Sequence, residues 1–180
     1  MAAVLERFAE QARAVVVDTM TTAQEDGLDE VRAEHLLLSL ARVADGTTSA
    51  VLAEHGLDEA FVASVVRGPG RLLDDDDRSA LGALGIDVDD VLARIEDGLG
   101  PEALAPVGGT RRPRFAKEAK KALEMAVRTT TARHARTIST DDLLVGIVRA
   151  GSPGVGRVLA AASTSPDAVV VSVERRRGAA

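Results

Sequence analysis

The sequence contains no cysteine, tryptophan or tyrosine, and three phenylalanines make up the whole aromatic content, 2% of 180 residues. Without cysteine there is no disulfide framework, no thiolate zinc site and no cysteine nucleophile, and we expect a cytoplasmic protein. Because large aromatic side chains are almost missing, the core has to be built from Ala, Val and Leu. Such small residues favour short distances between packed helices.

Several functional signatures are also missing. No apolar run approaches the roughly 20 residues of a membrane-spanning helix, so we predict no membrane segment. The sequence has no G-x-x-x-x-G-K-[ST] loop to hold the phosphates of ATP, and no G-x-S-x-G motif of a serine hydrolase, so we expect no enzymatic activity. The net charge of −6 argues against a general nucleic-acid surface, because phosphate binding depends on clustered Lys and Arg.

No residue group has the spacing of a metal site, and we predict no cofactor. The acidic run at residues 74–77 lacks the alternating ligands, the turn glycine and the terminal Glu of a calcium loop. The three histidines, His35, His55 and His134, have neither the i, i+4 spacing nor the carboxylate partner typical of zinc ligands.

What the chain does contain is an internal repeat. Phe8 aligns with Phe115, which sets an offset of 107 residues (115 minus 8). Without a gap, the same offset aligns Leu36-Leu37 with Leu143-Leu144 and Val51-Leu52-Ala53 with Val158-Leu159-Ala160. We therefore predict an all-α fold of two pseudo-twofold related four-helix repeats, residues 1–67 and 113–180, which together form one globular unit.

Apolar residues at helical spacing predict where the helices lie. In the first repeat we expect helices at about 6–26, 33–44, 49–54 and 58–66. In the second repeat we expect them at about 114–132, from Ser139 onward, at 154–161 and after Ser165, with both serines as N-caps. The valines at 169–171 could instead form a strand, but the repeat favours a helix.

Residues 68–112 have the composition of a linker between the repeats. They open with Gly68-Pro69-Gly70 and include the acidic run. Apolar residues between 81 and 95 recur at helical spacing, which predicts one or two short amphipathic helices here.

Two stretches, Arg7-Phe8-Ala9-Glu10-Gln11-Ala12 and Ala33-Glu34-His35-Leu36-Leu37-Leu38-Ser39-Leu40, recur at 114–121 and 140–147. They resemble the N-terminal domain of Clp unfoldases, the Clp repeat, in its ClpC-like form but without the ATPase modules. The resemblance implies a non-catalytic docking platform whose partners are proteins or peptides, such as Clp substrates, adaptors or Clp subunits. A small-molecule ligand is a further candidate. We expect a monomer that acts as an accessory factor or a decoy.

The resemblance also implies a ligand site. In ClpC-like domains the Glu of a Thr-Glu-His-Ile-Leu-Leu-Gly-Leu stretch in each repeat helps to bind phosphoarginine, and the matching positions here are Glu34 and Asp141. A carboxylate can pair with a guanidinium in a fork, and amides at a helix start can receive phosphate. Ala33 and Asp142 replace the Thr and the His of that stretch. Alternatively, both acids only stabilise the first turn of their helices, by about 0.3 to 1 kcal/mol each.

A second functional class remains open: a regulatory or DNA-associated helical protein that uses the fold for a role unrelated to proteolysis. The basic clusters Arg111-Arg112-Arg114 and Arg175-Arg176-Arg177 would supply its phosphate contacts. However, no interleaved aromatic residues provide a stacking platform, and arginines in the last turn of a helix also complement its dipole. DNA affinity that falls steeply with salt would favour this class.

Overall fold

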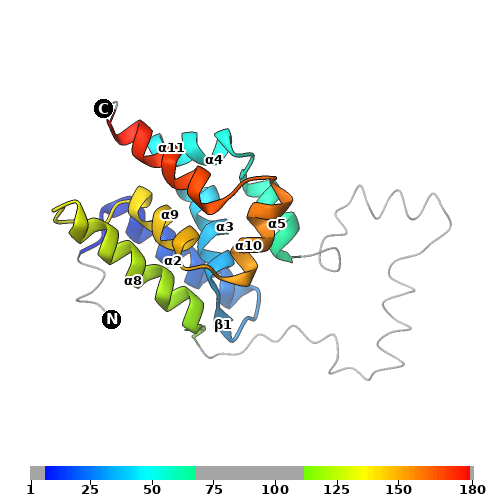
Figure 1. Ribbon diagram of the computed structural model, residues 1–180. Helices are drawn as coiled ribbons and strands as arrows, with labels where there is room; N and C mark the ends of the chain where they lie inside the picture. The colour runs from blue at the N-terminus through cyan, green and yellow to red at the C-terminus, as the bar shows by residue number, and fades with distance from the viewer. Residues whose placement is uncertain (1–6, 68–111, 179–180) are drawn as a thin grey trace, which may run out of the picture.

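The structure, a computed structural model described for residues 7–67 and 112–178, is almost entirely helical (Figure 1). The first repeat comprises α2 (Glu10–Glu25), β1 (Glu30–Val31), α3 (Ala33–Val43), α4 (Gly46–Glu54) and α5 (Glu59–Arg67). The second repeat comprises β2 (Arg114–Phe115), α8 (Lys117–Ala132), α9 (Thr140–Arg149), α10 (Pro153–Ala161) and α11 (Pro166–Gly178). The predicted all-α fold is confirmed. The linker helices predicted between 81 and 95 lie outside the described residues.

The helix boundaries follow the sequence repeat. Both ends of α8 lie 107 residues after the ends of α2 (117 minus 10 and 132 minus 25), and the same holds for α10 and α4 (153 minus 46 and 161 minus 54). The predicted caps are present, since Ser139 Oγ accepts the Asp142 amide at 3.2 Å and Ser165 Oγ accepts the Ala168 amide at 3.2 Å. The valines at 169–171 lie within α11, so the strand alternative is wrong.

The predicted starts of the two long helices, at about residues 6 and 114, are wrong. Their first residues are instead extended and pair with the other repeat: β1 runs parallel to β2, with Val31 beside Phe115, and Phe8 forms the equivalent bridge with Ile138. The amide of Ala116 donates to the Val31 carbonyl at 2.8 Å, and the amide of Ala9 to the Ile138 carbonyl at 2.9 Å. Each repeat therefore begins by pairing with its partner before its helix starts.

The two repeats also exchange their third helices. Helix α10 of the second repeat packs against α3 and α5 of the first, and α4 of the first repeat packs against α9 and α11 of the second. Figure 1 shows both exchanged pairs, with α4 beside α11 and α10 beside α5. The first turns of α4 and α10 consequently face the opposite repeat, and this arrangement positions the candidate site.

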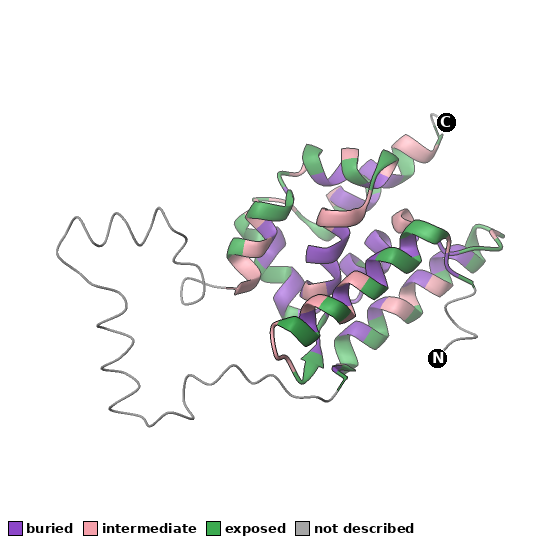
Figure 2. Ribbon diagram, turned by 180° about the vertical axis from the view of Figure 1, so that it is seen from behind, coloured by how far each residue is buried: buried purple, intermediate pink, exposed green. Residues whose placement is uncertain are grey.

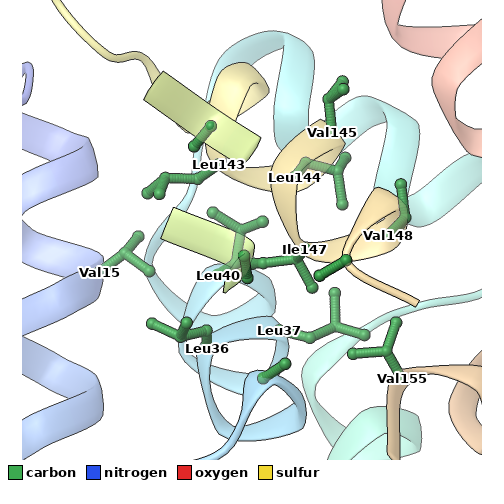
Figure 3. Packing of buried hydrophobic residues seen from close by; sticks show 14 of the residues in the cluster. Val15, Leu36, Leu37, Leu40, Leu143, Leu144, Val145, Ile147, Val148 and Val155 are labelled. Atoms are coloured by element: carbon green, nitrogen blue, oxygen red, sulfur yellow. The ribbon is translucent and has the colours of Figure 1, made fainter. Parts of the chain in front are cut away.

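Helices α3 and α9 form the centre of the core. Four leucines of α3 are buried, together with the corresponding residues of α9, although these residues lie on several sides of each helix: Leu36, Leu37, Leu38, Leu40, Leu143, Leu144, Val145 and Ile147. Leu40 and Ile147, which the offset aligns, lie side by side (Figure 3). Exposed residues are confined to the outer faces of the surrounding helices (Figure 2). Leucines on several sides of a helix require neighbours on several sides, and the exchanged helices supply them.

Within the described residues no single helix has the length and apolar composition of a membrane span. The pairs α3 with α4 and α9 with α10 reach that length and composition only when taken together, and they bend by 110° and 101°. The hydrophobicity of α3 and α9 is accounted for by their central place in the core.

The two repeats differ in how closely their first and second helices approach. A Cβ atom at Gly146 of α9 would lie 2.5 Å from the carbonyl oxygen of Ala122 and 2.6 Å from the amide nitrogen of Ala126, both in α8. The offset aligns these three small residues with Ser39, Val15 and Thr19 of the first repeat. The larger side chains keep α2 farther from α3, whereas α8 and α9 are almost in backbone contact.

This contact predicts opposite effects for two glycine substitutions. Gly146→Ala should lower the free energy of unfolding by about 1–3 kcal/mol, because the backbone of α8 has to move to make room. Gly156→Ala, in α10, meets no atom within 4 Å and should raise it by about 0.5–1 kcal/mol through helix propensity. Urea unfolding followed by circular dichroism measures both. Equal effects in the two variants would contradict the close packing.

Candidate functional site

Glu34 lies in the first turn of α3, against the first turn of α10 from the other repeat. Its side chain is buried, with the residue only 7% exposed, and its carboxylate sits where a side chain at Gly154 would be. Only glycine leaves room for the carboxylate at that position. Glu34 has no hydrogen bond or ion pair with any other residue that the structure describes. It is therefore a buried acid whose bonding capacity is not used within residues 7–67 and 112–178.

Asp141 occupies the pseudo-equivalent place in the second repeat. It lies in the first turn of α9, against the first turn of α4, where the Thr48 hydroxyl donates to its Oδ1 at 2.5 Å. On its other side the Nε atom of Arg177, in the last turn of α11, lies 3.5 Å from its Oδ2. Both oxygens of Asp141 therefore have partners within the chain.

The structure thus places the two predicted residues at two equivalent junctions between the repeats. At each junction the first turn of a second helix meets the first turn of the third helix from the other repeat. The prediction that these two carboxylates hold equivalent positions follows from the offset. Their environments differ, however, because Glu34 has no partner in the described structure and Asp141 has two.

Asp142, next to Asp141, is fully buried in a network of donors. Its carboxylate accepts hydrogen bonds from the Arg133 guanidinium at 2.8 and 3.1 Å and from the Thr130 hydroxyl at 2.8 Å. It also accepts the Ser139 amide at 3.2 Å and Arg177 at 2.9 Å. Burial alone would raise the pKa of Asp142, but the hydrogen bonds, those from Arg133 above all, hold it below its usual value. Asp142 is ionised and structural.

His35 stands at the position of Asp142 in the first repeat and has a different environment. Its Nδ1 accepts the Arg32 amide at 3.1 Å, and burial lowers its pKa more than the nearby charge of Glu34 raises it. The ring is therefore neutral at pH 7. His35 also lines a hollow of about 120 Å³ between α2, α3 and α5, together with Thr22 and Ser39. Glu34 does not line this hollow, so it is separate from the candidate site.

The arginines at the end of α11 hold that helix against the first repeat. Arg175 and Arg176 contact the two carboxylate oxygens of Glu54 at 2.5 and 2.9 Å. His55 lies beside them, with its ring nitrogens 3.0 Å from the Ser172 hydroxyl and 2.8 Å from the Thr164 hydroxyl. The basic cluster at 175–177 therefore forms ion pairs within the chain, in addition to complementing the helix dipole.

Three residues of the candidate site were missed by the sequence analysis. Gly154 and Thr48 lie in the first turns of the exchanged helices, and the offset could have pointed to those turns but not to the exchange. Arg177 gave no signal for its role, because the offset aligns it with Gly70, beyond the end of α5.

This interleaved pair of four-helix repeats is the fold of the N-terminal domains of Clp-type proteins. The sequence matches the family described as Clp repeat (R) N-terminal domain over residues 7–69 and 71–162, which is most of the chain. The chain belongs to this family.

Solved structures share the fold over nearly the full length of both chains. The N-terminal domain of the caseinolytic protease associated chaperone ClpD from Arabidopsis thaliana is 17% identical, with 95% of this chain and 97% of that chain covered and a TM-score of 0.62. The Hsp104 N-terminal domain from Candida albicans is 12% identical, with 96% and 93% covered and a TM-score of 0.62. A protein from a malarial protein secretion system is 14% identical, with 94% of each chain covered and a TM-score of 0.61. At these identities the likeness concerns the fold.

The ion pairs of Glu54 predict an acid-sensitive contribution to stability. The hydrogen bonds from Arg175 and Arg176 lower the pKa of Glu54 from 4.5 to about 2. Because the folded-state pKa is the lower one, the stabilisation is complete above pH 4.5 and is lost as the pH falls toward 2. Glu54→Gln should therefore be less stable than the natural chain at pH 7, and the difference should shrink between pH 4.5 and 2. Urea midpoints measured across this range test the prediction, which a pH-independent difference would contradict.

Proposed function

We propose that the chain is a non-catalytic recognition module of the Clp unfoldase system, which binds protein or peptide partners through a guanidinium group at Glu34. Phosphoarginine on a substrate is the ligand we favour. The family supports the general role, since Clp N-terminal domains receive substrates and adaptors. The observation that carries the finer proposal is the buried carboxylate of Glu34, which has no partner among the described residues.

The state of Glu34 favours a cationic, hydrogen-bonding ligand. A buried carboxylate without a partner is costly, so a ligand that supplies donors and positive charge gains free energy that an exposed acid would not provide. A guanidinium presents two parallel N–H groups that match the two carboxylate oxygens. It is thus a better match for Glu34 than the single point charge of a lysine ammonium.

The start of α10 adds a place for an anion beside the same carboxylate. Ser152 caps this helix by accepting the Val155 amide at 3.2 Å, and Pro153 at the first position has no amide hydrogen. The amide of Gly154 comes next, at the positive end of the helix dipole. A phosphoryl group attached to a guanidinium would meet this end of the helix. The two parts of phosphoarginine therefore have separate partners at the junction.

Under this proposal the chain captures the same class of ligand as the N-terminal domain of a Clp machine. The 180 residues include no phosphate loop of an ATPase. A module that binds such ligands without an attached motor would deliver them as an accessory factor or withhold them as a decoy. Competition between the chain and a Clp N-terminal domain for one labelled peptide distinguishes these roles from no role in the system.

The test is calorimetric titration with a peptide that carries one phosphoarginine residue. The natural chain should bind it saturably. Glu34→Gln should weaken binding by about tenfold to a hundredfold, because a hydrogen bond to a charged group contributes about 1.5–3 kcal/mol. The matched control is Asp167→Asn, which removes an exposed first-turn acid of α11 away from both junctions and should leave the affinity unchanged.

Two outcomes would contradict the proposal. The natural chain, folded by circular dichroism, could fail to bind the peptide. Alternatively, Glu34→Gln could bind as tightly as the natural chain. In that case Glu34 would only stabilise the first turn of α3, and both first-turn variants should show the same small loss of stability.

A further inference from the structure

We infer that Arg177 is an internal occupant of the second junction, so that each chain binds one external guanidinium group, at Glu34, and none at Asp141. The inference rests on the proposed function, because it concerns which of the two equivalent positions is available to the ligand. It is carried by a separate observation, the placement of the α11 arginine on the carboxylates of α9.

The guanidinium of Arg177 already makes the contacts that an external guanidinium would make. Its Nε lies 3.5 Å from Asp141 Oδ2, one terminal nitrogen donates to Asp142 Oδ1 at 2.9 Å, and the other donates to Glu174 at 2.8 Å. Its side chain is only 12% exposed. Since Thr48 donates to the remaining oxygen of Asp141, both oxygens of this carboxylate are in use.

Displacement of Arg177 would disturb more than one ion pair. Asp142 shares the same guanidinium and has no exposed surface, so it would lose a donor that solvent cannot replace. An external ligand at Asp141 would therefore have to compete with a tethered guanidinium, which is present at a high effective concentration. We expect the position to stay closed to peptides at ordinary concentrations.

The first repeat has no counterpart of this arrangement in sequence. The offset aligns Arg177 with Gly70 (177 minus 107), which has no side chain, and aligns Asp142 with His35. Neither residue can act as the second carboxylate or as the internal guanidinium. The asymmetry between the junctions therefore follows from residues that differ between the two copies.

The test counts binding sites by titration with the same phosphoarginine peptide. The natural chain should bind one peptide, and Arg177→Ala should bind two. The double variant Arg177→Ala, Asp141→Asn should return to one. The matched control Arg175→Ala, which loses a contact with Glu54 but none with Asp141, should also bind one. Two peptides bound to the natural chain, or one bound to a folded Arg177→Ala variant, would overturn the inference and leave the proposed function standing.

A second measurement needs no substitution at Arg177. In nuclear magnetic resonance spectra of the natural chain, the peptide should shift the Gly154 amide and leave the Arg177 Nε–H and Asp141 amide signals in place. Shifts of all three signals that saturate together would show that the second junction is open, which overturns the inference. If no signal shifts and calorimetry detects no binding to any variant, the proposed function fails as well.

Discussion

Burial of α3 against α9, across the pseudo-twofold axis, is the constraint from which the other contacts follow. Leucines on several sides of α3 cannot be covered by its own repeat alone, and the same holds for α9. The exchange of α4 and α10 between the repeats provides the missing cover. It also brings the first turn of each third helix to the first turn of a central helix, so the candidate junctions arise from core packing.

The repeat in the sequence predicted most of this fold. The offset of 107 residues located the equivalent helices, and Ser139 and Ser165 marked helix starts by local chemistry that needs no tertiary contact. The starts of the two long helices were misplaced because Phe8 and Phe115 pair with residues of the other repeat. Such pairing leaves no local signal, since an apolar residue at helical spacing suits a helix equally well.

The candidate site was predictable in position but not in state. The first-turn acids Glu34 and Asp141 could be located because they follow the repeat, and both lie where an acid favours a helix start. Whether an acid has a partner depends on side chains far away in sequence. Arg177 reaches Asp141 across 36 residues (177 minus 141), from a helix whose extra turn has no equivalent in the first repeat. The exchange that brings Gly154 to Glu34 is likewise a property of the whole fold.

The difference between the junctions can be understood as two uses of one inherited geometry. A carboxylate that receives ligands has to remain without an internal partner, and its burial then lowers the stability of the unliganded chain. In the second repeat this disadvantage is removed, since Arg177, Arg133 and Thr48 satisfy the acids of α9. The close approach of α8 to α9 at Gly146 belongs to the same half of the molecule. A duplicated domain can therefore use one copy mainly for stability, which allows the other copy to keep the unsatisfied group that recognition requires.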